Sequence, residues 1–229
     1  AYGNYNDASV VGEICKSKGV PFILNGAYTV GIVNVKGSDV NADFITASAH
    51  KSMASSGPMG LLGYSKEYEK IITKRSSLQG DLTGKTFGNK MCYMLGCPGV
   101  YGAPLMTLMA SFPAIVERTQ PESVQSMIEK AQYVVKNVER IEGVNFLGSR
   151  PKKHHLINFE TPGFKKVAET HERKGFFLRE EFKERGVIGM APGISKKLEV
   201  SIYGLSWDQV HYLTDAIISI AKKYGLKIE

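Results

Sequence analysis

The sequence has little of several features that would point to a particular protein class. Only three of its 229 residues are cysteine, at irregular spacing, which excludes a disulfide framework and favours a reducing compartment, the cytoplasm. It has no apolar run of the about eighteen residues that a membrane helix needs, so we expect no membrane segment. The histidines show no metal-ligand spacing, so we expect no metal site.

The excess of positive charge is moderate. Lysine and arginine number 29 against 22 acidic residues, which gives a formal net charge of +7. Such a balance permits contact with a polyanion without requiring it. No local signature of a nucleic-acid-binding module is present. The chain also opens on Ala1 with no methionine and no signal segment, which predicts that it was cut from a longer sequence.

The apolar patterns of the first half predict an α/β protein. Asp7 is placed to cap a helix to about residue 18, and Gly19 to end it. Two short apolar runs, Val20–Leu24 and Phe44–Ala47, are typical of buried parallel strands. A glycine-rich strand is expected at 57–63, followed by a long loop at 76–90.

The second half changes character. Helical sequence begins near residue 103, and apolar residues then recur at helical spacing from 121 to 141. Behind this helix we expect an α+β module. Its expected elements are a strand at 156–159, a helix at 176–185, strands near Val187 and at 198–202, and a last helix opened by a capping box of Ser206 and Gln209.

The candidate chemistry lies where the two apolar runs end. The first run ends in Asn25–Tyr28 and the second in Ser48–Lys51. Ligands of open parallel sheets bind at the carboxyl ends of strands. A lysine directly after a buried strand is costly to bury, and burial lowers the pKa of a lysine amine, which suits Schiff-base chemistry. The simpler alternative is an exposed lysine where the strand emerges into solvent.

Several blocks of the sequence resemble a known family. The segment Ala42–Met53 resembles the cofactor-lysine segment of fold-type I pyridoxal-phosphate enzymes. Four blocks in the same order are similar to the archaeal O-phosphoseryl-tRNA:cysteinyl-tRNA synthase family: His50–Ala54, Met94–Cys97, Thr107–Pro113 and Ser201–Leu205. The resemblance implies an aminotransferase-like α/β fold. It places part of a large cofactor-binding domain at 1–130 and a small α+β domain at 131–229.

The same resemblance implies a pyridoxal 5'-phosphate site. Lys51 would hold the cofactor covalently, with His50 and Ser48 near its phosphate and ring. Asn25 falls where cysteine desulfurases carry an aspartate against the pyridine nitrogen, and Tyr28 where they place a glutamine near the ring hydroxyl. A neutral asparagine would make the ring a weaker electron sink, which is tolerable because phosphate is a good leaving group. Turn chemistry is the alternative explanation for Asn25 and Tyr28.

Cys97 matches the family's functional cysteine by its position in the Met94–Cys97 block. A thiolate there could carry sulfur. Cys92 lies close by in the sequence and is an alternative reactive thiol. Cys15 falls on the apolar face of the first helix, where we expect it in the core.

The resemblance implies conversion of O-phosphoseryl-tRNA(Cys) to cysteinyl-tRNA(Cys) by β-replacement of phosphate with sulfur. Lys51 would act as the general base at the α-carbon. The Ser201–Leu205 block lacks the arginine with which desulfurases clamp a free carboxylate, and an amino acid esterified to tRNA has no free carboxylate. Two alternatives stay open: a desulfurase or selenocysteine lyase acting on free amino acid, and a non-catalytic subunit that binds tRNA or a partner synthetase.

Partners follow from the same resemblance. They are phosphoserine-carrying tRNA(Cys), a second copy in a homodimer, and a phosphoseryl-tRNA synthetase. The basic groups at 150–153 and 196–197 are predicted to face the tRNA acceptor arm. Family members are longer, with an amino-terminal part that supplies a ring stacker, a phosphate-binding turn and early strands of the sheet. We therefore expect exposed apolar surface near Val20–Leu24 and Phe44–Ala47.

Overall fold

The computed structural model describes residues 3–75, 90–92, 102–190 and 195–229. Contacts between α-carbons divide the chain into two compact units. The amino-terminal unit comprises Asp7–Ser123, and the carboxyl-terminal unit comprises Val124–Glu229 together with Ala1–Asn6.

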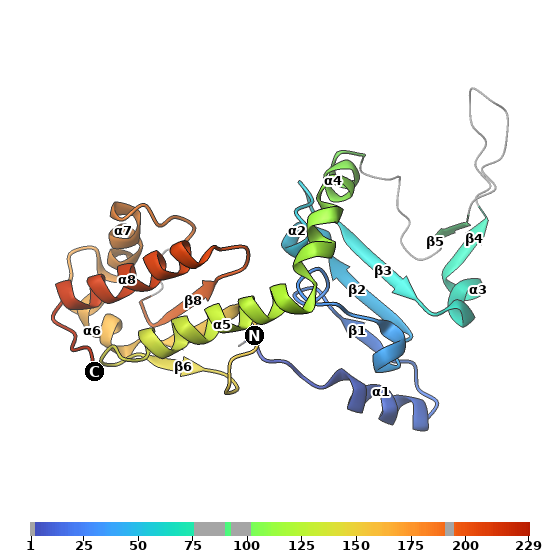
Figure 1. The fold of residues 1–229 in the computed structure, drawn as a ribbon, viewed down its shortest axis with the longest axis horizontal. Coiled ribbons are helices and arrows are strands. Elements are labelled where there is room, and N and C mark those ends of the chain that lie inside the picture. The colour runs from blue at the N-terminus through green and yellow to red at the C-terminus, as the bar shows by residue number, and fades with distance from the viewer. Residues whose placement is uncertain (1–2, 76–89, 93–101, 191–194) are drawn as a thin grey trace. The chain divides into compact units, whose positions relative to one another are not determined.

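The amino-terminal unit alternates helices and short strands (Figure 1). Asp7 caps its first helix as expected, since the carboxylate accepts a hydrogen bond from the Ser9 amide at 3.0 Å. The elements in chain order are α1 (Ala8–Ser17), β1 (Ile23–Asn25), η1 (Gly37–Val40), β2 (Phe44–Ser48), α2 (Ala49–Ser52), β3 (Gly60–Tyr64), η2 (Lys66–Tyr68), α3 (Glu69–Ile72), β4 (Thr73–Arg75), β5 (Lys90–Cys92) and α4 (Gly102–Arg118).

A three-stranded sheet in the order β1-β2-β3 forms the centre of this unit. β1 runs parallel to β2, with Asn25 opposite Thr46. β3 runs antiparallel to β2, with Gly60 opposite Ser48. The carboxyl ends of β1 and β2 therefore meet at one edge of the sheet, which is the arrangement that the two apolar runs predict.

Much apolar surface of this unit is exposed. Val20 is 54% exposed and Ile23 is 62% exposed, as expected for the first run. The second run, Phe44–Ala47, is half-buried or buried, so the expected exposure is wrong there. The apolar face of α1 is also exposed and Cys15 is only half-buried, so the prediction that Cys15 lies in the core is wrong. An amphipathic pattern marks the apolar face of a helix but not whether anything covers it.

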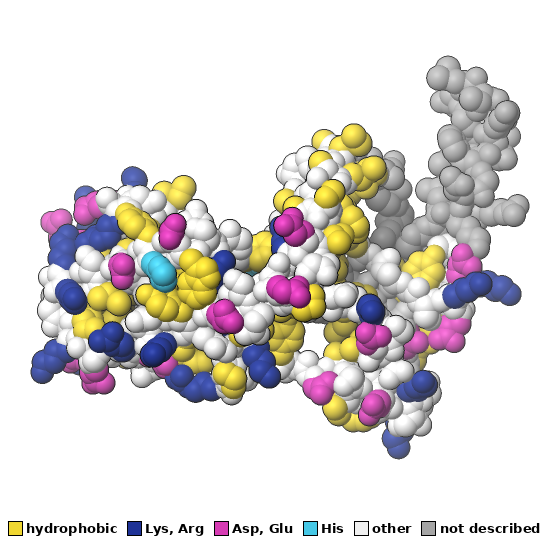
Figure 2. All heavy atoms as spheres, viewed as in Figure 1, with side chains coloured by type: hydrophobic (Ala, Val, Ile, Leu, Met, Phe, Trp, Pro, Cys, Tyr) yellow, Lys and Arg dark blue, Asp and Glu magenta, His cyan; other side chains and the backbone are white. Residues whose placement is uncertain are grey.

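Helix α4 has two different faces. Leu108 and Ile115 are buried in a small core with Ala47, Ala49 and Met53. The opposite face exposes four large apolar side chains, and hydrophobic atoms gather over α4 in the space-filling view (Figure 2). These four residues are Met106, Met109, Phe112 and Val116.

The carboxyl-terminal unit is an α+β module around a three-stranded antiparallel sheet in the order β6-β7-β8. Phe159 of β7 lies opposite Phe146 of β6 and Leu198 of β8, so the three strands contribute to one layer. The elements in chain order are α5 (Pro121–Val138, which begins in the amino-terminal unit), β6 (Asn145–Leu147), β7 (Leu156–Glu160), α6 (Pro162–Thr170), η3 (Lys174–Phe176), α7 (Phe177–Glu184), β8 (Lys197–Ser201) and α8 (Trp207–Lys223).

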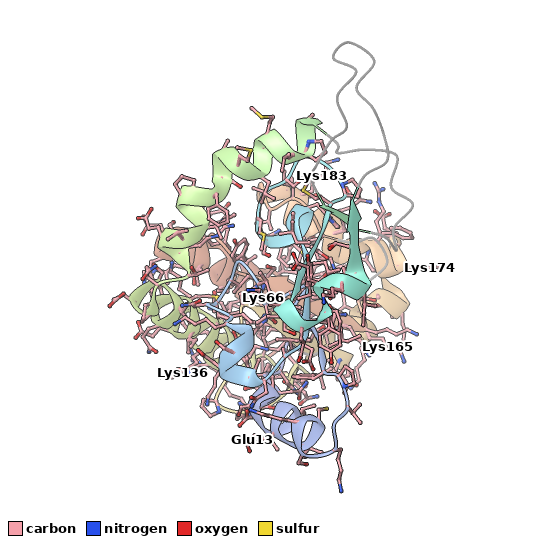
Figure 3. The ribbon with its side chains drawn as sticks, turned by 90° about the vertical axis from the view of Figure 1, so that its right-hand side faces the viewer. Glu13, Lys66, Lys136, Lys165, Lys174 and Lys183 are labelled. Carbon is pink, nitrogen blue, oxygen red and sulfur yellow. The ribbon has the colours of Figure 1, made fainter. Side chains whose placement is uncertain are left out.

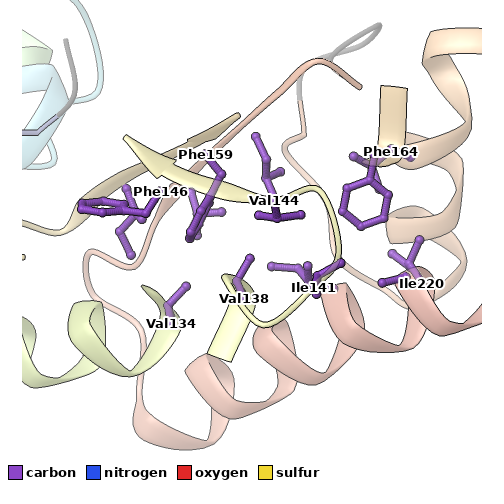
Figure 4. Close-up of a cluster of buried hydrophobic side chains, with 14 of the residues drawn as sticks. Val134, Val138, Ile141, Val144, Phe146, Phe159, Phe164 and Ile220 are labelled. Atoms are coloured by element: carbon purple, nitrogen blue, oxygen red, sulfur yellow. The ribbon is translucent and has the colours of Figure 1, made fainter. Parts of the chain in front are cut away.

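The main core lies between this sheet and its helices. Val134 and Val138 of α5 point toward the aromatic side chains of the sheet, and Ile220 of α8 lies in the same cluster (Figure 4). Helix α8 opens with the expected capping box, in which Ser206 accepts from the Gln209 amide and the Gln209 side chain accepts from the Ser206 amide. The helix then buries Val210, Ile217 and Ile220 completely.

The strand predicted near Val187 is wrong. Residues 187–190 form no strand, and the Val187 amide instead closes the end of α7 by donating to the Phe182 carbonyl at 2.9 Å. The apolar side chain of Val187 packs against the core from a loop. Strand β6 and helix α6 were not expected, and most of the predicted loop at 76–90 lies outside the described residues.

Candidate functional site

The site is built around the turn that follows β2. After Ser48 the chain enters the single turn of α2, whose first residue, Ala49, is fully buried. The Ala49 amide donates to the Met59 carbonyl at 2.9 Å, and its carbonyl accepts from the Met53 and Ser55 amides at 3.1 and 3.2 Å. These bonds fix the backbone on both sides of Lys51.

Lys51 projects from this turn and is exposed. Its Nζ lies 4.0 Å from the centroid of the Tyr28 ring, a cation–π contact. Among the described residues, Lys51 is therefore an exposed lysine close to the end of a strand, as in the simpler alternative. The structure brings Lys51 and Tyr28 together although they follow different strands.

Asn25 and Tyr28 belong to the turn that follows β1. Asn25 is exposed, and its Oδ1 accepts from the Ala27 amide at 3.2 Å, an Asx turn. The Gly26 amide donates to the Thr46 carbonyl at 2.8 Å, which ties this turn to β2. Tyr28 is 50% exposed, so its ring lies on an open surface and not in an enclosed cavity.

His50 and Ser48 flank the lysine turn. The His50 Nδ1 accepts from the Met59 amide at 3.3 Å, so the neutral ring carries its proton on Nε2. Ser48 is half-buried at the start of α2, and its side chain makes no capping bond. Ser48 and Asn25 thus lie at the same sheet edge as Lys51, while the Nδ1 of His50 is already engaged by the β3 side of the turn.

The structure describes the side chain of neither of the two cysteines that are candidates for the reactive thiol. Cys97 lies outside the described residues, and Cys92 is the last residue of β5. Which thiol reacts therefore stays a prediction. No group of three metal-ligating side chains occurs within the described residues, and none of the described helices is long and apolar enough to cross a membrane.

A cavity of about 820 Å³ lies elsewhere in the same unit. Its lining includes Pro21 before β1, Asp43 before β2 and Ser65 after the antiparallel β3. These positions mark the end of the sheet opposite to Lys51. The cavity is therefore not where strand-end ligand chemistry is expected, and we place the candidate site at the lysine turn.

The prediction that the basic group at 150–153 faces the tRNA acceptor arm is wrong for Lys152, which is buried. This residue is 3% exposed, its Nζ donates to the Gly3 carbonyl at 2.8 Å, and burial lowers the pKa of the amine to about 8. Arg150 forms an ion pair with Glu139. Lys196 and Lys197 are exposed, as are other lysines of this unit at 165, 174 and 183 (Figure 3).

Sequence reasoning did not identify Arg118 at the end of α4. Its guanidinium donates to the carbonyls of Gly31 and Ser52, next to the two turns that carry Tyr28 and Lys51. The helical pattern before it contains Ser111, which also contacts the lysine turn. No local pattern could have found Arg118, because its partners lie far away in the sequence.

Comparison with known proteins places these residues in a family. The family model of aminotransferase class-V matches residues 1–180. O-phospho-L-seryl-tRNA:Cys-tRNA synthase 2 of Archaeoglobus fulgidus is 46% identical over 228 residues, covering 100% of this chain and 58% of that protein. The synthase of Methanopyrus kandleri is 46% identical over 227 residues, covering 99% of this chain and 57% of that protein. The chain thus spans less than two thirds of the length of these relatives.

Solved structures confirm the expected fold. A SepCysS–SepCysE N-terminal domain complex matches with a TM-score of 0.83 and 43% identity, covering 97% of this chain and 57% of that chain. A NifS-like protein from Rickettsia africae matches with a TM-score of 0.66 at 11% identity, covering 96% of this chain and 59% of that chain, which shows the fold alone. The fold is the α/β fold of type I pyridoxal-phosphate enzymes, and the chain belongs to the aminotransferase class-V family.

Proposed function

We propose that this chain is the lysine-bearing part of a pyridoxal-phosphate enzyme that converts O-phosphoseryl-tRNA(Cys) to cysteinyl-tRNA(Cys). The observation that carries the proposal is the position of Lys51, directly after β2 and at the same edge of the sheet as Asn25. The relatives that are 46% identical over nearly the whole chain are named for this reaction.

The residues at this edge fit the cofactor by their chemistry. Lys51 offers an exposed primary amine, and the Tyr28 ring lies 4.0 Å from it. The Asn25 amide and the Ser48 hydroxyl are neutral hydrogen-bonding groups that would hold the cofactor together with Lys51. When bound, pyridoxal phosphate stabilises negative charge that develops on the substrate α-carbon.

The chain's own groups then have distinct roles. The Lys51 amine takes the proton from the substrate α-carbon and later returns it, as a general base and acid. Asn25, being neutral, leaves the cofactor a weaker electron sink than an aspartate would. This suffices because the group that leaves the β-carbon is phosphate. The tRNA ester of the substrate has no free carboxylate, so the site does not need an arginine clamp.

The net reaction replaces oxygen by sulfur on the β-carbon. The bond between the β-carbon and the phosphate oxygen breaks, and phosphate leaves with the electron pair. A bond from a sulfur nucleophile to the same carbon forms. Cys97 is the proposed sulfur carrier, as a persulfide, and transfer of its outer sulfur requires two electrons from a thiol reductant. The finer division of the chain at residue 130, the homodimer and the synthetase partner belong to the same proposal.

The test is covalent capture of the cofactor. The purified chain is incubated with pyridoxal phosphate, the linkage is reduced with borohydride, and the modified peptide is identified by mass spectrometry. We expect the label on Lys51. Lys51→Ala should lose the visible absorption of bound cofactor, whereas Lys66→Ala, an exposed lysine of η2 in the same unit, should keep it (Figure 3). A label on another lysine would contradict the assignment.

The substrate is tested separately. The chain, loaded with cofactor and supplied with sulfide, is given phosphoseryl-tRNA(Cys), and cysteinyl-tRNA is measured after deacylation. Formation of cysteine on the tRNA supports the proposal. Release of sulfide from free cysteine would instead favour the desulfurase alternative, and cofactor binding without either reaction would favour a non-catalytic subunit.

A further inference from the structure

Helix α4 is attached to the segment that follows Lys51 by a series of polar contacts. The Ser56 amide donates to the Thr107 hydroxyl at 2.9 Å. One helical turn further on, the Ser111 hydroxyl lies 2.5 Å from the Met53 carbonyl oxygen. The face of α4 that carries these contacts also buries Leu108 against Ala49 and Met53. The position of the lysine turn is therefore tied to α4.

Arg118, the last residue of α4, makes two further contacts in this series. Its Nε donates to the Gly31 carbonyl at 3.3 Å, and its terminal nitrogen donates to the Ser52 carbonyl. The Ser52 hydroxyl, itself only 3% exposed, donates to the Val30 carbonyl at 2.6 Å. One guanidinium and one hydroxyl thus join the turn after β1 to the turn after β2.

The two joined segments approach each other closely. Gly31 has a φ of +86°, and a β-carbon there would lie 2.8 Å from the Met53 Cγ. A planar guanidinium presents donors at fixed angles, so it can hold two carbonyl oxygens in a defined relation. A flexible lysine ammonium has no such fixed fork.

The joined atoms lie beside the two side chains that meet at the site. Ser52 directly follows Lys51, and Gly31 lies in the turn from Thr29 to Val33, which directly follows the turn that contains Tyr28. We infer that Arg118 is a positioning residue for Lys51: by holding the Gly31 and Ser52 carbonyls together, it sets the Lys51 amine over the Tyr28 ring. Arg118 does not touch the reacting atoms. The inference rests on the proposed function only in assigning the cofactor to Lys51.

The first test needs no cofactor. Hydrogen exchange of the Met53 and Ser55 amides, which close the lysine turn, is compared between the unmodified chain and Arg118→Ala. We expect exchange about tenfold faster in the variant, because a charge-assisted bond to the Ser52 carbonyl is lost. Arg140→Ala is the control, since Arg140 also donates to a main-chain oxygen, that of Glu229, in the carboxyl-terminal unit. Unchanged exchange in Arg118→Ala would overturn the inference.

The second test separates positioning from mere stability. The visible circular dichroism of bound pyridoxal phosphate, per mole of cofactor, reports how the cofactor is oriented by the lysine that holds it. We expect it to change in Arg118→Ala and to return only in part in Arg118→Lys, while Arg140→Ala leaves it unchanged. A lower melting temperature with unchanged dichroism would show a structural role alone and overturn the inference.

Two outcomes need a separate interpretation: a variant that does not fold and a chain that binds no cofactor. If Arg118→Ala does not fold, Ser111→Ala removes the bond to the Met53 carbonyl and should produce the same two effects to a smaller extent. If the unmodified chain binds no cofactor at Lys51, the proposed function fails. The exchange test would still decide whether Arg118 fixes the lysine turn.

Discussion

The clearest energetic prediction concerns Glu181 of α7, whose side chain is 7% exposed. Burial alone would raise its pKa, but hydrogen bonds from Lys223, Tyr224 and Arg185 outweigh this and lower the pKa to about 2. The three donors lie 2.5, 2.7 and 2.6 Å from its oxygens. Compared with an ordinary value of 4.5, this shift corresponds to about 3 kcal/mol of folding free energy at neutral pH.

Replacing Glu181 by glutamine keeps the shape and removes the charge. We expect the free energy of unfolding at pH 7 to fall by about 2–3 kcal/mol, somewhat below the full value because the Lys223 side chain is 49% exposed and can be solvated. Because the folded-state pKa is lowered, the stabilisation is complete above about pH 4.5 and is lost as the pH falls toward about 2. The difference between the two proteins should shrink over that window.

The assay is urea unfolding followed by tryptophan fluorescence. The chain has a single tryptophan, Trp207, at the start of α8, so the signal reports on the carboxyl-terminal unit. Glu169→Gln is the control, since the Lys165–Glu169 pair is 3.9 Å long with both side chains more than half exposed, and we expect a change below about 0.5 kcal/mol. Equal unfolding free energies for Glu181→Gln and the unmodified chain at pH 7 would refute the reasoning.

Three further predictions concern the same unit. Burial first, and then the electrostatic effects of His154 and Lys152, lower the pKa of His155 to about 3. Stability should therefore fall as the pH drops from about 6.5 toward about 3, and this slope should weaken in His155→Gln, as measured by urea unfolding at each pH. Ser206→Ala removes the cap of α8 and should cost about 1 kcal/mol in the same assay, whereas Ser149→Ala, which keeps its backbone bond to Asn4, should cost little. Phe159→Ala removes a fully buried side chain from the central strand of the sheet and should lower the free energy of unfolding by about 3–5 kcal/mol, with a large decrease in melting temperature. A decrease in unfolding free energy below about 1 kcal/mol would contradict the packing described for the sheet.

Elements with strong local signals could be predicted from the sequence. The capping box at Ser206 and the apolar spacing behind it specify α8 within its own residues, and Asp7 specifies the start of α1 in the same way. The strand prediction at Val187 is wrong because a single apolar residue does not distinguish a strand from a loop that packs on the core. Burial also depends on partners that are distant in the sequence, so the exposed face of α1 could not be seen in its pattern.

The candidate site was predictable in one respect only. Two parallel strands that each end in polar residues imply that Asn25 and Lys51 share a sheet edge, and the structure has this arrangement. The contact between Lys51 and the Tyr28 ring depends on side-chain direction, which strand assignment does not give. The bonds of Arg118 to Gly31 and Ser52 join residues far apart in the chain, and one sequence contains no signal for such a pairing.

The central sheet of the amino-terminal unit also bears on how this chain is handled in solution. Among the described residues, β1 and β3 each pair with β2 alone, and Ile23, Leu62 and Tyr64 are exposed on these outer strands. Unpaired main-chain groups beside apolar side chains are a template on which an extended peptide, or a second copy of this chain, can add a strand. Protein concentration is therefore an experimental variable in every assay of this chain, and light scattering should accompany each spectroscopic measurement.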